Sequence, residues 1–542
     1  MEITGNIVLI PERKIKPGKI IVEAGKISDI IFDENKYDNF ILPGFIDSHV
    51  HIESSMMVPE NFGKIAMQNG TIAVVTDPHE IANVLGIEGV DFMMSSADNT
   101  DLKIFFGAPS CVPATGFETS GATLSAAEIS KILNREKTVC LSEMMNFPGV
   151  IFNDKEVWEK LTVAKKMNLP IDGHAPGLMG EDLNKYVAGG ISTDHECSTI
   201  EEALEKIALG MKILIREGSA ARNFEALYPL ISSHPESVML CTDDSHPDEL
   251  LEKGHINKIV KIGIKKGIDV FKLLTAACIN PIKHYNLPVG QLNKGDFADF
   301  IVVNNLSDFE VRSTYINGKK IKSEKDTSKR EAIHINNFHA RKISTADILI
   351  SSEKESEKIH IINAFDGDLL TKISTRILKC NDGILMSDSE YDILKMVVLN
   401  RYKEGVKPAV AFIKGFGIKN GAIASTIAHD SHNIIAVGSD DVLIAEAINR
   451  IVETRGGIVA VDDTGKFEIL PLPVAGLLTT DPVEIVAEKY KTLNQFVKKM
   501  GSAMRAPFMT LSFMALLVIP EIKLSDKGLF DGNKFVFIDL FE

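Results

Sequence analysis

The sequence GFIDSHVH at residues 44–51 predicts a short buried β-strand that ends in two histidines. Residues two apart in an extended strand point to the same side, so His49 and His51 direct both imidazoles at one point in space. Imidazole is a good ligand for Zn, Fe, Ni or Cu. The pair therefore indicates a metal site at the end of a strand, although two nearby histidines also arise by chance.

Similar segments follow this strand at regular intervals. Each is short and apolar, ends in polar or charged residues, and precedes helix-like sequence. They are TIAVVTDPHE (71–80), DLKIFFGAP (101–109), TVCLSEMMN (138–146), NLPIDGHAP (168–176), GISTDHEC (190–197), KILIREGS (212–219) and SVMLCTDDSH (237–246). Eight strands that alternate with helices predict an α/β fold, a (β/α)₈ TIM-like barrel over residues 44–285.

The sequences on both sides of the barrel have β character. GNIVLI (5–10) and GQLNKGDFADFIVVNNLSDFEVRSTYINGKKI (290–321) alternate apolar and polar residues between glycines. Neither side has enough strands to be stable alone. We therefore expect one small, discontinuous β-sandwich domain from residues 1–43 and 286–329, with the barrel inserted in it.

The remaining third of the chain predicts another domain. SEKDTSKR (323–330) is polar without periodicity and indicates a linker. Beyond it, alternating stretches such as AVAFIKGF (409–416) mix with helical ones such as DVLIAEAINRIVETRGG (441–457). Residues 330–542 are therefore expected to form a C-terminal α/β domain.

Composition limits the partners and the compartment. The formal net charge is −15, from 59 basic and 74 acidic residues, which argues against a nucleic-acid-binding surface. The six cysteines include no CxxC pair, which favours a reducing, cytoplasmic compartment. The best apolar run, residues 513–520, is far shorter than the roughly 20 residues of a membrane span. We expect a cytoplasmic protein that binds neither nucleic acid nor membrane.

Four more potential metal ligands end other predicted strands: Glu143, His174, His195 and Asp243. The carboxyl ends of barrel strands converge on one catalytic face, so these side chains would meet His49 and His51. Taken singly, each has an ordinary alternative as a capping carboxylate or a hydrogen-bonded core histidine. Together they predict a pocket for two divalent cations.

Several motifs carry a resemblance to a known family. PGFIDSHVH and GQLNKGDFADFIVV resemble the amidohydrolase superfamily. HVHIESSMM, VVTDPHEIANVLG, LSEMMNFPGV, DGHAPGL and STDHECST more narrowly resemble the adenine deaminase family. The likeness continues through IREGSAARN, CTDDSHP, IAHDSHNIIAVGSDD and LPLPVAGL, and so covers nearly the whole chain.

This resemblance implies a ligand set and a reaction. It implies that His49, His51 and Asp243 hold one metal, that His174 and His195 hold the other, and that Glu143 bridges both. The family suggests Mn²⁺ or Fe²⁺, and the ligands are also compatible with Zn²⁺. The implied reaction is the hydrolysis of adenine to hypoxanthine and ammonia in purine salvage, with Glu143 and Asp243 as catalytic residues. Because the exocyclic amino group must be protonated before it can leave as ammonia, Asp243 is expected to accept a proton from water and pass it to that group. We also expect a homo-oligomer, a dimer or larger.

Other polar residues near the strand ends are candidate substrate contacts. Glu53 continues the two-residue spacing of the histidines, His79 follows the second strand, and Arg216 ends the seventh. Glu53 has an alternative role in solvent or behind the ligands, and Arg216 in a structural ion pair. Asp244 is a further substrate candidate, although Asp244 and His246 are equally placed to orient Asp243.

The motif His429-Asp430-Ser431-His432 in the last domain has spacing typical of a metal site. A helix cap or a lid over the active site explains the motif as well.

Two other functions remain open on the residues alone. A cyclic-amide hydrolase, a sugar deacetylase or an enzyme for a related aminopurine shares the same metal chemistry. A non-catalytic scaffold on the same fold predicts missing ligands, whereas every expected position is filled. A deaminase releases ammonia from adenine, whereas a cyclic-amide hydrolase opens the ring of a hydantoin. Assays with both substrates therefore distinguish the two enzyme classes. A metal content below about one ion per subunit would favour the scaffold.

Overall fold

The computed structural model describes residues 1–219, 221–322, 327–328 and 330–542. The described residues divide into two compact units. The barrel unit comprises Met1–Pro78, Asp91–Ser110 and Leu124–Asp326. The C-terminal unit comprises His79–Val90, Cys111–Thr123 and Thr327–Glu542. Of the linker predicted at 323–330, residues 323–326 and 329 lie outside the described residues.

A ring of parallel strands forms the centre of the barrel unit. Its members are β5 (Phe45–His51), β6 (Thr71–Thr76), β7 (Lys103–Ala108), β8 (Thr138–Met144), β9 (Ile171–Gly173), β10 (Thr193–Asp194), β11 (Lys212–Arg216) and β12 (Val238–Cys241). Hydrogen-bonded pairing follows chain order from β5 to β9 and from β10 to β12. The ring closes because β9 lies beside β10, β12 lies beside β5, and β13 (Asp243–Asp244) pairs with β5. The predicted (β/α)₈ barrel is confirmed.

Helices follow the barrel strands in the chain. They include α1 (Pro59–Gln68), α3 (Ile87–Ala97), α4 (Ala126–Leu133), α5 (Phe147–Ile151), α6 (Lys155–Lys166), α7 (Gly180–Ala188), α8 (Ile200–Ala208), α9 (Phe224–Leu227), α10 (Pro229–Ser233), α11 (Pro247–Lys253), α12 (Ile256–Lys265), α13 (Val270–Leu274) and α14 (Asn280–Tyr285). Ser125 begins α4 with a capping box to Glu128, and the Asp154 carboxylate caps α6. Every residue of β5 and β6 is buried, as expected for strands covered on both faces.

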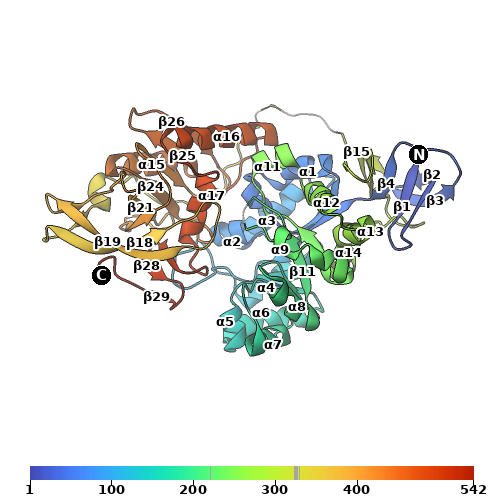
Figure 1. The fold of residues 1–542 in the computed structure, drawn as a ribbon, viewed down its shortest axis with the longest axis horizontal. Coiled ribbons are helices and arrows are strands. Elements are labelled where there is room, and N and C mark those ends of the chain that lie inside the picture. The colour runs from blue at the N-terminus through green and yellow to red at the C-terminus, as the bar shows by residue number, and fades with distance from the viewer. Residues whose placement is uncertain (220, 323–326, 329) are drawn as a thin grey trace. The chain divides into compact units, whose positions relative to one another are not determined.

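A smaller sheet takes strands from both flanks of the barrel. Its order is β16-β15-β14-β4-β1-β2-β3. The strands are β1 (Glu2–Leu9), β2 (Lys14–Glu23), β3 (Lys26–Phe32), β4 (Phe40–Pro43), β14 (Phe300–Val303), β15 (Val311–Ile316) and β16 (Lys319–Lys320). Ile41 of β4 lies opposite Val302 of β14, and Figure 1 shows β15 close to β1–β4. The chain thus leaves this sheet at β4, forms the barrel and returns at β14.

The C-terminal unit is built on a mostly antiparallel sheet of order β17-β20-β19-β18-β22-β21-β24-β23-β25-β26. Its strands are β17 (Ile350–Ser351), β18 (Ser356–Asn363), β19 (Lys372–Asn381), β20 (Ile384–Leu385), β21 (Leu394–Leu399), β22 (Ala409–Lys414), β23 (Gly421–Ser425), β24 (Ile434–Gly438), β25 (Gly457–Asp462) and β26 (Phe467–Pro471). A second sheet contains β27 (Ile522–Ser525), β28 (Gly528–Asp531) and β29 (Val536–Phe537). The unit also contains α2 (His79–Leu85), α15 (Asp441–Thr454), α16 (Val483–Lys499) and α17 (Pro507–Ser512).

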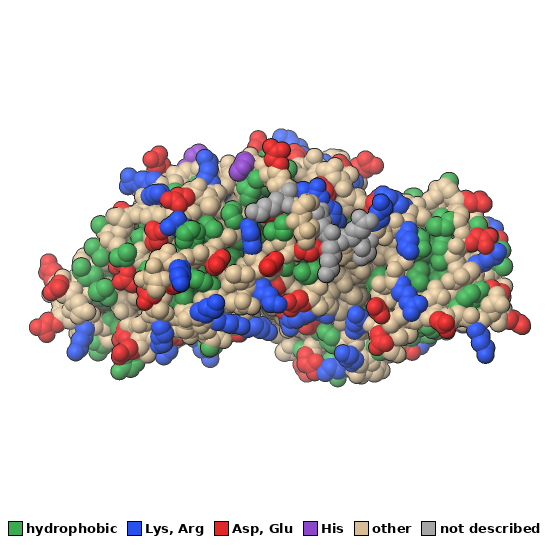
Figure 2. All heavy atoms as spheres, turned by 90° about the horizontal axis from the view of Figure 1, so that it is seen from above, with side chains coloured by type: hydrophobic (Ala, Val, Ile, Leu, Met, Phe, Trp, Pro, Cys, Tyr) green, Lys and Arg blue, Asp and Glu red, His purple; other side chains and the backbone are tan. Residues whose placement is uncertain are grey.

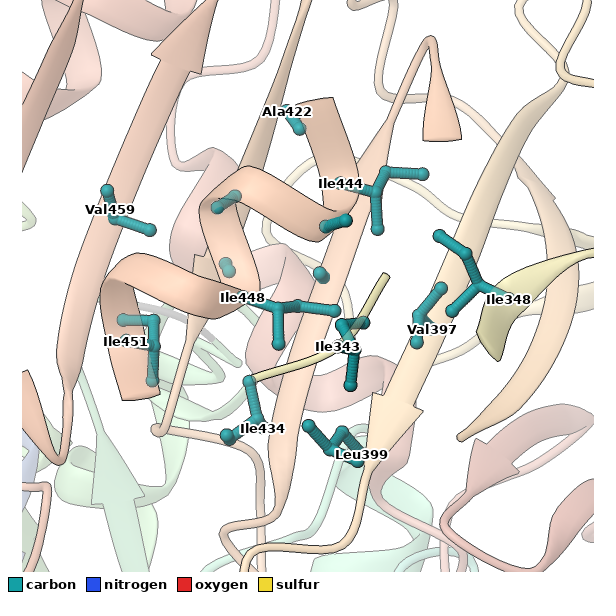
Figure 3. Close-up of a cluster of buried hydrophobic side chains, with 14 of the residues drawn as sticks. Ile343, Ile348, Val397, Leu399, Ala422, Ile434, Ile444, Ile448, Ile451 and Val459 are labelled. Carbon is teal, nitrogen blue, oxygen red and sulfur yellow. The ribbon is translucent and has the colours of Figure 1, made fainter. Parts of the chain in front are cut away.

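Helix α15 packs on β23, β24 and β25 of the large sheet. Its apolar residues Ile444, Ile448 and Ile451 are fully buried, and Figure 3 shows them in one cluster with Val397 and Val459. The helix predicted at 441–457 is therefore present, and its apolar stripe forms part of the core of the C-terminal unit.

Two segments from within the barrel sequence belong to the C-terminal unit. They are His79–Val90, which follows β6, and Cys111–Thr123, which follows β7. The side-chain amide of Asn433 donates to the Thr119 carbonyl oxygen at 2.9 Å. The Asp526 carboxylate accepts from the Thr119 backbone N–H at 2.9 Å. The segment Cys111–Thr123 is thus held by residues of 327–542.

The described part of the chain contains no helix long and apolar enough to cross a membrane. Figure 2 shows acidic and basic side chains interspersed over the face that it displays.

Candidate metal centre

The predicted ligands lie at the carboxyl ends of the barrel strands. His49 and His51 end β5, Glu143 lies near the end of β8, and Asp243 follows β12. His174 directly follows β9 and His195 directly follows β10. Five of these six side chains are at most 8% exposed and His174 is 12% exposed. The structure therefore brings together all six residues that the sequence singled out.

The first half of the centre contains His49, His51 and Asp243. The Nε2 atoms of the two imidazoles are 3.2 Å apart. Oδ1 of Asp243 lies 3.1 Å from His51 Nε2 and 3.5 Å from His49 Nε2. Two nitrogens and one carboxylate oxygen thus converge on one point.

Glu143 faces both halves of the centre. Its Oε1 lies 3.3 Å from Nε2 of His51, whereas its Oε2 lies 2.7 Å from Nδ1 of His174 and 3.2 Å from Nε2 of His195. The rings of His49 and His195 stack with centroids 4.2 Å apart, so the two halves adjoin. The two oxygens of Glu143 thus face histidines of both halves.

These separations fit divalent metal ions. Two ligands that are each about 2.1 Å from a shared ion, at angles of 90–110°, lie roughly 3.0–3.4 Å apart. His51 Nδ1 faces the Asp77 carbonyl oxygen at 3.1 Å, and donation to that oxygen leaves the Nε2 lone pair directed at Glu143 and Asp243. A nitrogen lone pair and two carboxylates repel one another unless a cation lies between them.

Burial and the nearby positive charges shift the pKa values of the Glu143 and Asp243 carboxylates in opposite directions. Burial alone raises the pKa of Glu143, but contacts with His174, His195 and His51 hold that pKa well below its ordinary value. Burial likewise opposes ionisation of Asp243, yet Arg216 and His49 lower its pKa well below the usual range. Both groups are therefore ionised and able to accept a cation.

The pKa of His174 reflects the negative charge around the second half of the centre. Burial lowers its pKa, but Glu196 and Glu143 together raise the pKa of His174 to about 9. Without a metal ion, a proton on this ring neutralises part of the negative charge. A metal ion bound there would displace that proton.

Arg216, a predicted substrate contact, forms ion pairs with Asp243 and Glu196. Its Nη1 lies 2.5 Å from Oδ2 of Asp243 and contacts Oε1 of Glu196, while its Nη2 lies 3.2 Å from Oε2 of Glu196. Glu217 pairs with Arg222 at 3.5 Å. Arg216 is therefore engaged by two acidic side chains of the barrel unit.

The other predicted contacts have different surroundings. Glu53 is buried in the 3-10 turn Ile52–Ser55 that follows β5. Asp244 accepts a hydrogen bond from the Ser54 hydroxyl. His246 is buried, and its backbone N–H donates to the Ser219 hydroxyl at 2.9 Å. His79 lies in the C-terminal unit.

Sequence reasoning missed two acidic residues that support the ligands. Glu196 lies 3.5 Å from His195 Nε2 and 3.7 Å from His174 Nδ1. Asp47 accepts the backbone N–H groups of His49, at 3.3 Å, and Thr242, at 3.1 Å. Both stand within two residues of a predicted histidine ligand, which is the signal that could have identified them.

Comparisons with known proteins agree with the motifs. Residues 40–321 match the model of the amidohydrolase family, and residues 368–536 match the model of the adenine deaminase C-terminal domain. An adenine deaminase of Methanosarcina acetivorans is 52% identical, over 99% of both chains. Those of Methanosarcina barkeri and Salinibacter ruber are 53% and 46% identical, over 98% and 99% of this chain and 98% of their own.

Proposed function

This chain belongs to the adenine deaminase family of the amidohydrolases, and we propose that it hydrolyses adenine to hypoxanthine and ammonia. The reaction breaks the bond between C6 and the exocyclic nitrogen and forms a bond between C6 and the oxygen of water. The observation that carries the proposal is the pair of ionised carboxylates, Glu143 and Asp243, set among four imidazoles at the carboxyl ends of the barrel strands.

The proposed cofactors are two divalent cations, Mn²⁺ or Fe²⁺. His49, His51 and Asp243 would hold one, His174 and His195 would hold the other, and Glu143 lies where it could contact both. When bound, such cations lower the pKa of water from about 15.7 to near 7, which makes water a nucleophile at neutral pH. The donor set of imidazoles and carboxylates, with no cysteine, supports this assignment.

Asp243 is the proposed proton carrier. Its Oδ1 faces the imidazoles of the centre and its Oδ2 is held by Arg216. As a base, Asp243 accepts the proton that water loses on attack at C6. As an acid, it returns that proton to the exocyclic nitrogen, so that ammonia leaves as a neutral molecule.

Substrate recognition is proposed to involve side chains around this centre. Glu53 and Asp244 follow ligands in the chain, and both carry carboxylates that suit the N–H groups of a purine. His79 remains a predicted contact. For Arg216, the ion pairs with Asp243 and Glu196 support a positioning role rather than direct substrate binding.

Ammonia measurement with several substrates tests the proposal. Protein reconstituted with Mn²⁺ is incubated separately with adenine, adenosine, guanine, cytosine and hydantoin. We expect ammonia and hypoxanthine in equal amounts from adenine, and much slower release from the other bases and the nucleoside. Ring opening of hydantoin without ammonia from adenine would instead identify a cyclic-amide hydrolase.

A further inference from the structure

A second group of imidazoles and carboxylates lies in the C-terminal unit. Nδ1 of His429 contacts Oε1 of Glu80, and Nε2 of His432 contacts Oε2 of the same carboxylate. Glu80 belongs to α2, whereas the histidines lie on the loop between β23 and β24. The ligand atoms of these three residues all lie within 4.8 Å of one another.

Two further side chains border this group. Nε2 of His79 lies 3.5 Å from Oε1 of Glu80 and 3.8 Å from Oδ1 of Asp430. All five side chains are at most 8% exposed. Oδ2 of Asp430 is buried, and no hydrogen-bond partner for it occurs among the described residues. A buried oxygen of this kind is costly unless a cation or a donor faces it.

The arrangement around Glu80 repeats that around Glu143. In both places each oxygen of a buried carboxylate faces an imidazole nitrogen, and the residues come from segments far apart in the chain. Two histidines with one glutamate are an established donor set for zinc, and the same donors suit Mn²⁺.

We propose that Glu80, His429 and His432 bind a third divalent transition-metal ion, in addition to the two proposed for the barrel unit. His79 and Asp430 are near enough to complete its coordination. Such an ion would fasten the segment His79–Val90 to the loop that carries His429 and His432, which is 349 residues away in the chain. Its binding free energy would then stabilise the C-terminal unit.

A proton-only clamp is the rival arrangement of the same residues. The backbone N–H of Ala428 points to Nδ1 of His432 at 3.3 Å, which places the ring proton on Nε2, where it is donated to Glu80. Under the proposal, the cation replaces this proton and the Ala428 contact loosens. The two arrangements differ in metal content and in electron density between the three side chains.

Metal counting on the full-length protein tests the proposal. The protein is stripped with a chelator, reloaded with Zn²⁺, freed of excess ion and analysed by mass spectrometry for zinc. We expect three equivalents per subunit in the wild type and two in Glu80→Gln, which keeps the size of the side chain but removes its charge and turns one acceptor oxygen into an NH₂ donor. His429→Gln is a second variant with the same expectation. His360→Gln, in the same unit but outside the cluster, should retain three.

Crystals of the zinc-loaded wild type locate the ions directly. An anomalous difference peak between Glu80, His429 and His432, absent from Glu80→Gln while the two barrel peaks persist, supports the proposal. Two equivalents in the wild type with no peak at this position overturn it and leave the proton-only clamp. These readouts do not depend on deamination, so failure of the proposed activity and failure of this site are distinguishable.

Discussion

Nη1 of Arg216 lies 2.5 Å from Oδ2 of Asp243 and also contacts Oε1 of Glu196. One oxygen of Asp243 is therefore fixed by a permanent cation, while the other faces His51 at 3.1 Å. Glu196 directly follows His195 in the chain. The guanidinium of Arg216 therefore contacts Asp243 in one half of the centre and a neighbour of His195 in the other. Arg216 thus holds the proposed proton carrier in one orientation without occupying its second oxygen.

Replacing Arg216 with Gln should slow the enzyme without unfolding it. Loss of a group that orients a ligand typically costs about 10- to 100-fold in activity or metal affinity. We expect kcat/KM for adenine to fall by about that factor. Arg222→Gln provides the matched control, since Arg222 is partly exposed and pairs with Glu249 at 3.0 Å. Equal rates in the two variants would show that the Arg216 ion pair does not orient Asp243.

Asp243→Asn should abolish most of the turnover. The amide keeps an oxygen toward the histidines but cannot accept and return a proton, and such transfer is worth about 10²- to 10⁴-fold. The measurement is the rate of ammonia release with Mn²⁺ in excess, alongside circular dichroism to establish that the fold is intact. Near-normal turnover would refute the role of Asp243 as the proton carrier.

Glu143→Gln should reduce metal content in both halves of the centre. Its two oxygens face different histidines, so neutralising the carboxylate weakens both proposed sites. His174→Asn removes a ligand from one half only. After reloading with Mn²⁺, we expect a larger loss of bound metal in Glu143→Gln than in His174→Asn. Equal losses would indicate that Glu143 does not bridge.

The sequence alone predicted the barrel and the six residues that meet at the candidate metal centre because the relevant signals are local. His49 and His51 share a strand, and their two-residue spacing sets their common direction. Glu143, His174, His195 and Asp243 each stand at the end of an apolar run, and barrel geometry brings such ends together. Strand position was therefore sufficient to anticipate their meeting.

The partners of Arg216 could not be predicted from any local pattern. Arg216 meets Glu196 and Asp243 from another strand, and its chain neighbour Glu217 pairs elsewhere. The sequence pattern of residues 79–85 predicts a helix but does not indicate that this helix belongs to the C-terminal unit. The contact of Glu80 with His429 and His432 arises only when residues about 350 positions apart fold together.

Lys523 gives the C-terminal unit a stability that depends on pH. Its side chain is fully buried on β27 and donates to the Leu369 carbonyl oxygen. Burial lowers the pKa of Lys523 from 10.5 to about 7, although Asp368 opposes this shift. Between pH 7 and 10.5 the unfolded chain therefore binds the proton more readily than the folded one, so the free energy of unfolding rises with pH in this window.

Lys523→Met should remove that rise, which is at most about 1.4 kcal/mol per pH unit for one group. Below pH 7 both states of the wild type are protonated, so the contribution of Lys523 to the slope disappears there. Urea denaturation at pH 7, 8 and 9 measures the slope, and Lys534→Met, at a side chain that is 75% exposed, is the control. The slope is the decisive quantity, because methionine also loses the hydrogen bond to Leu369 and the stability at any single pH therefore changes for a second reason. If Lys523→Met and Lys534→Met give the same dependence on pH as the wild type, the Lys523 amine does not titrate in this range.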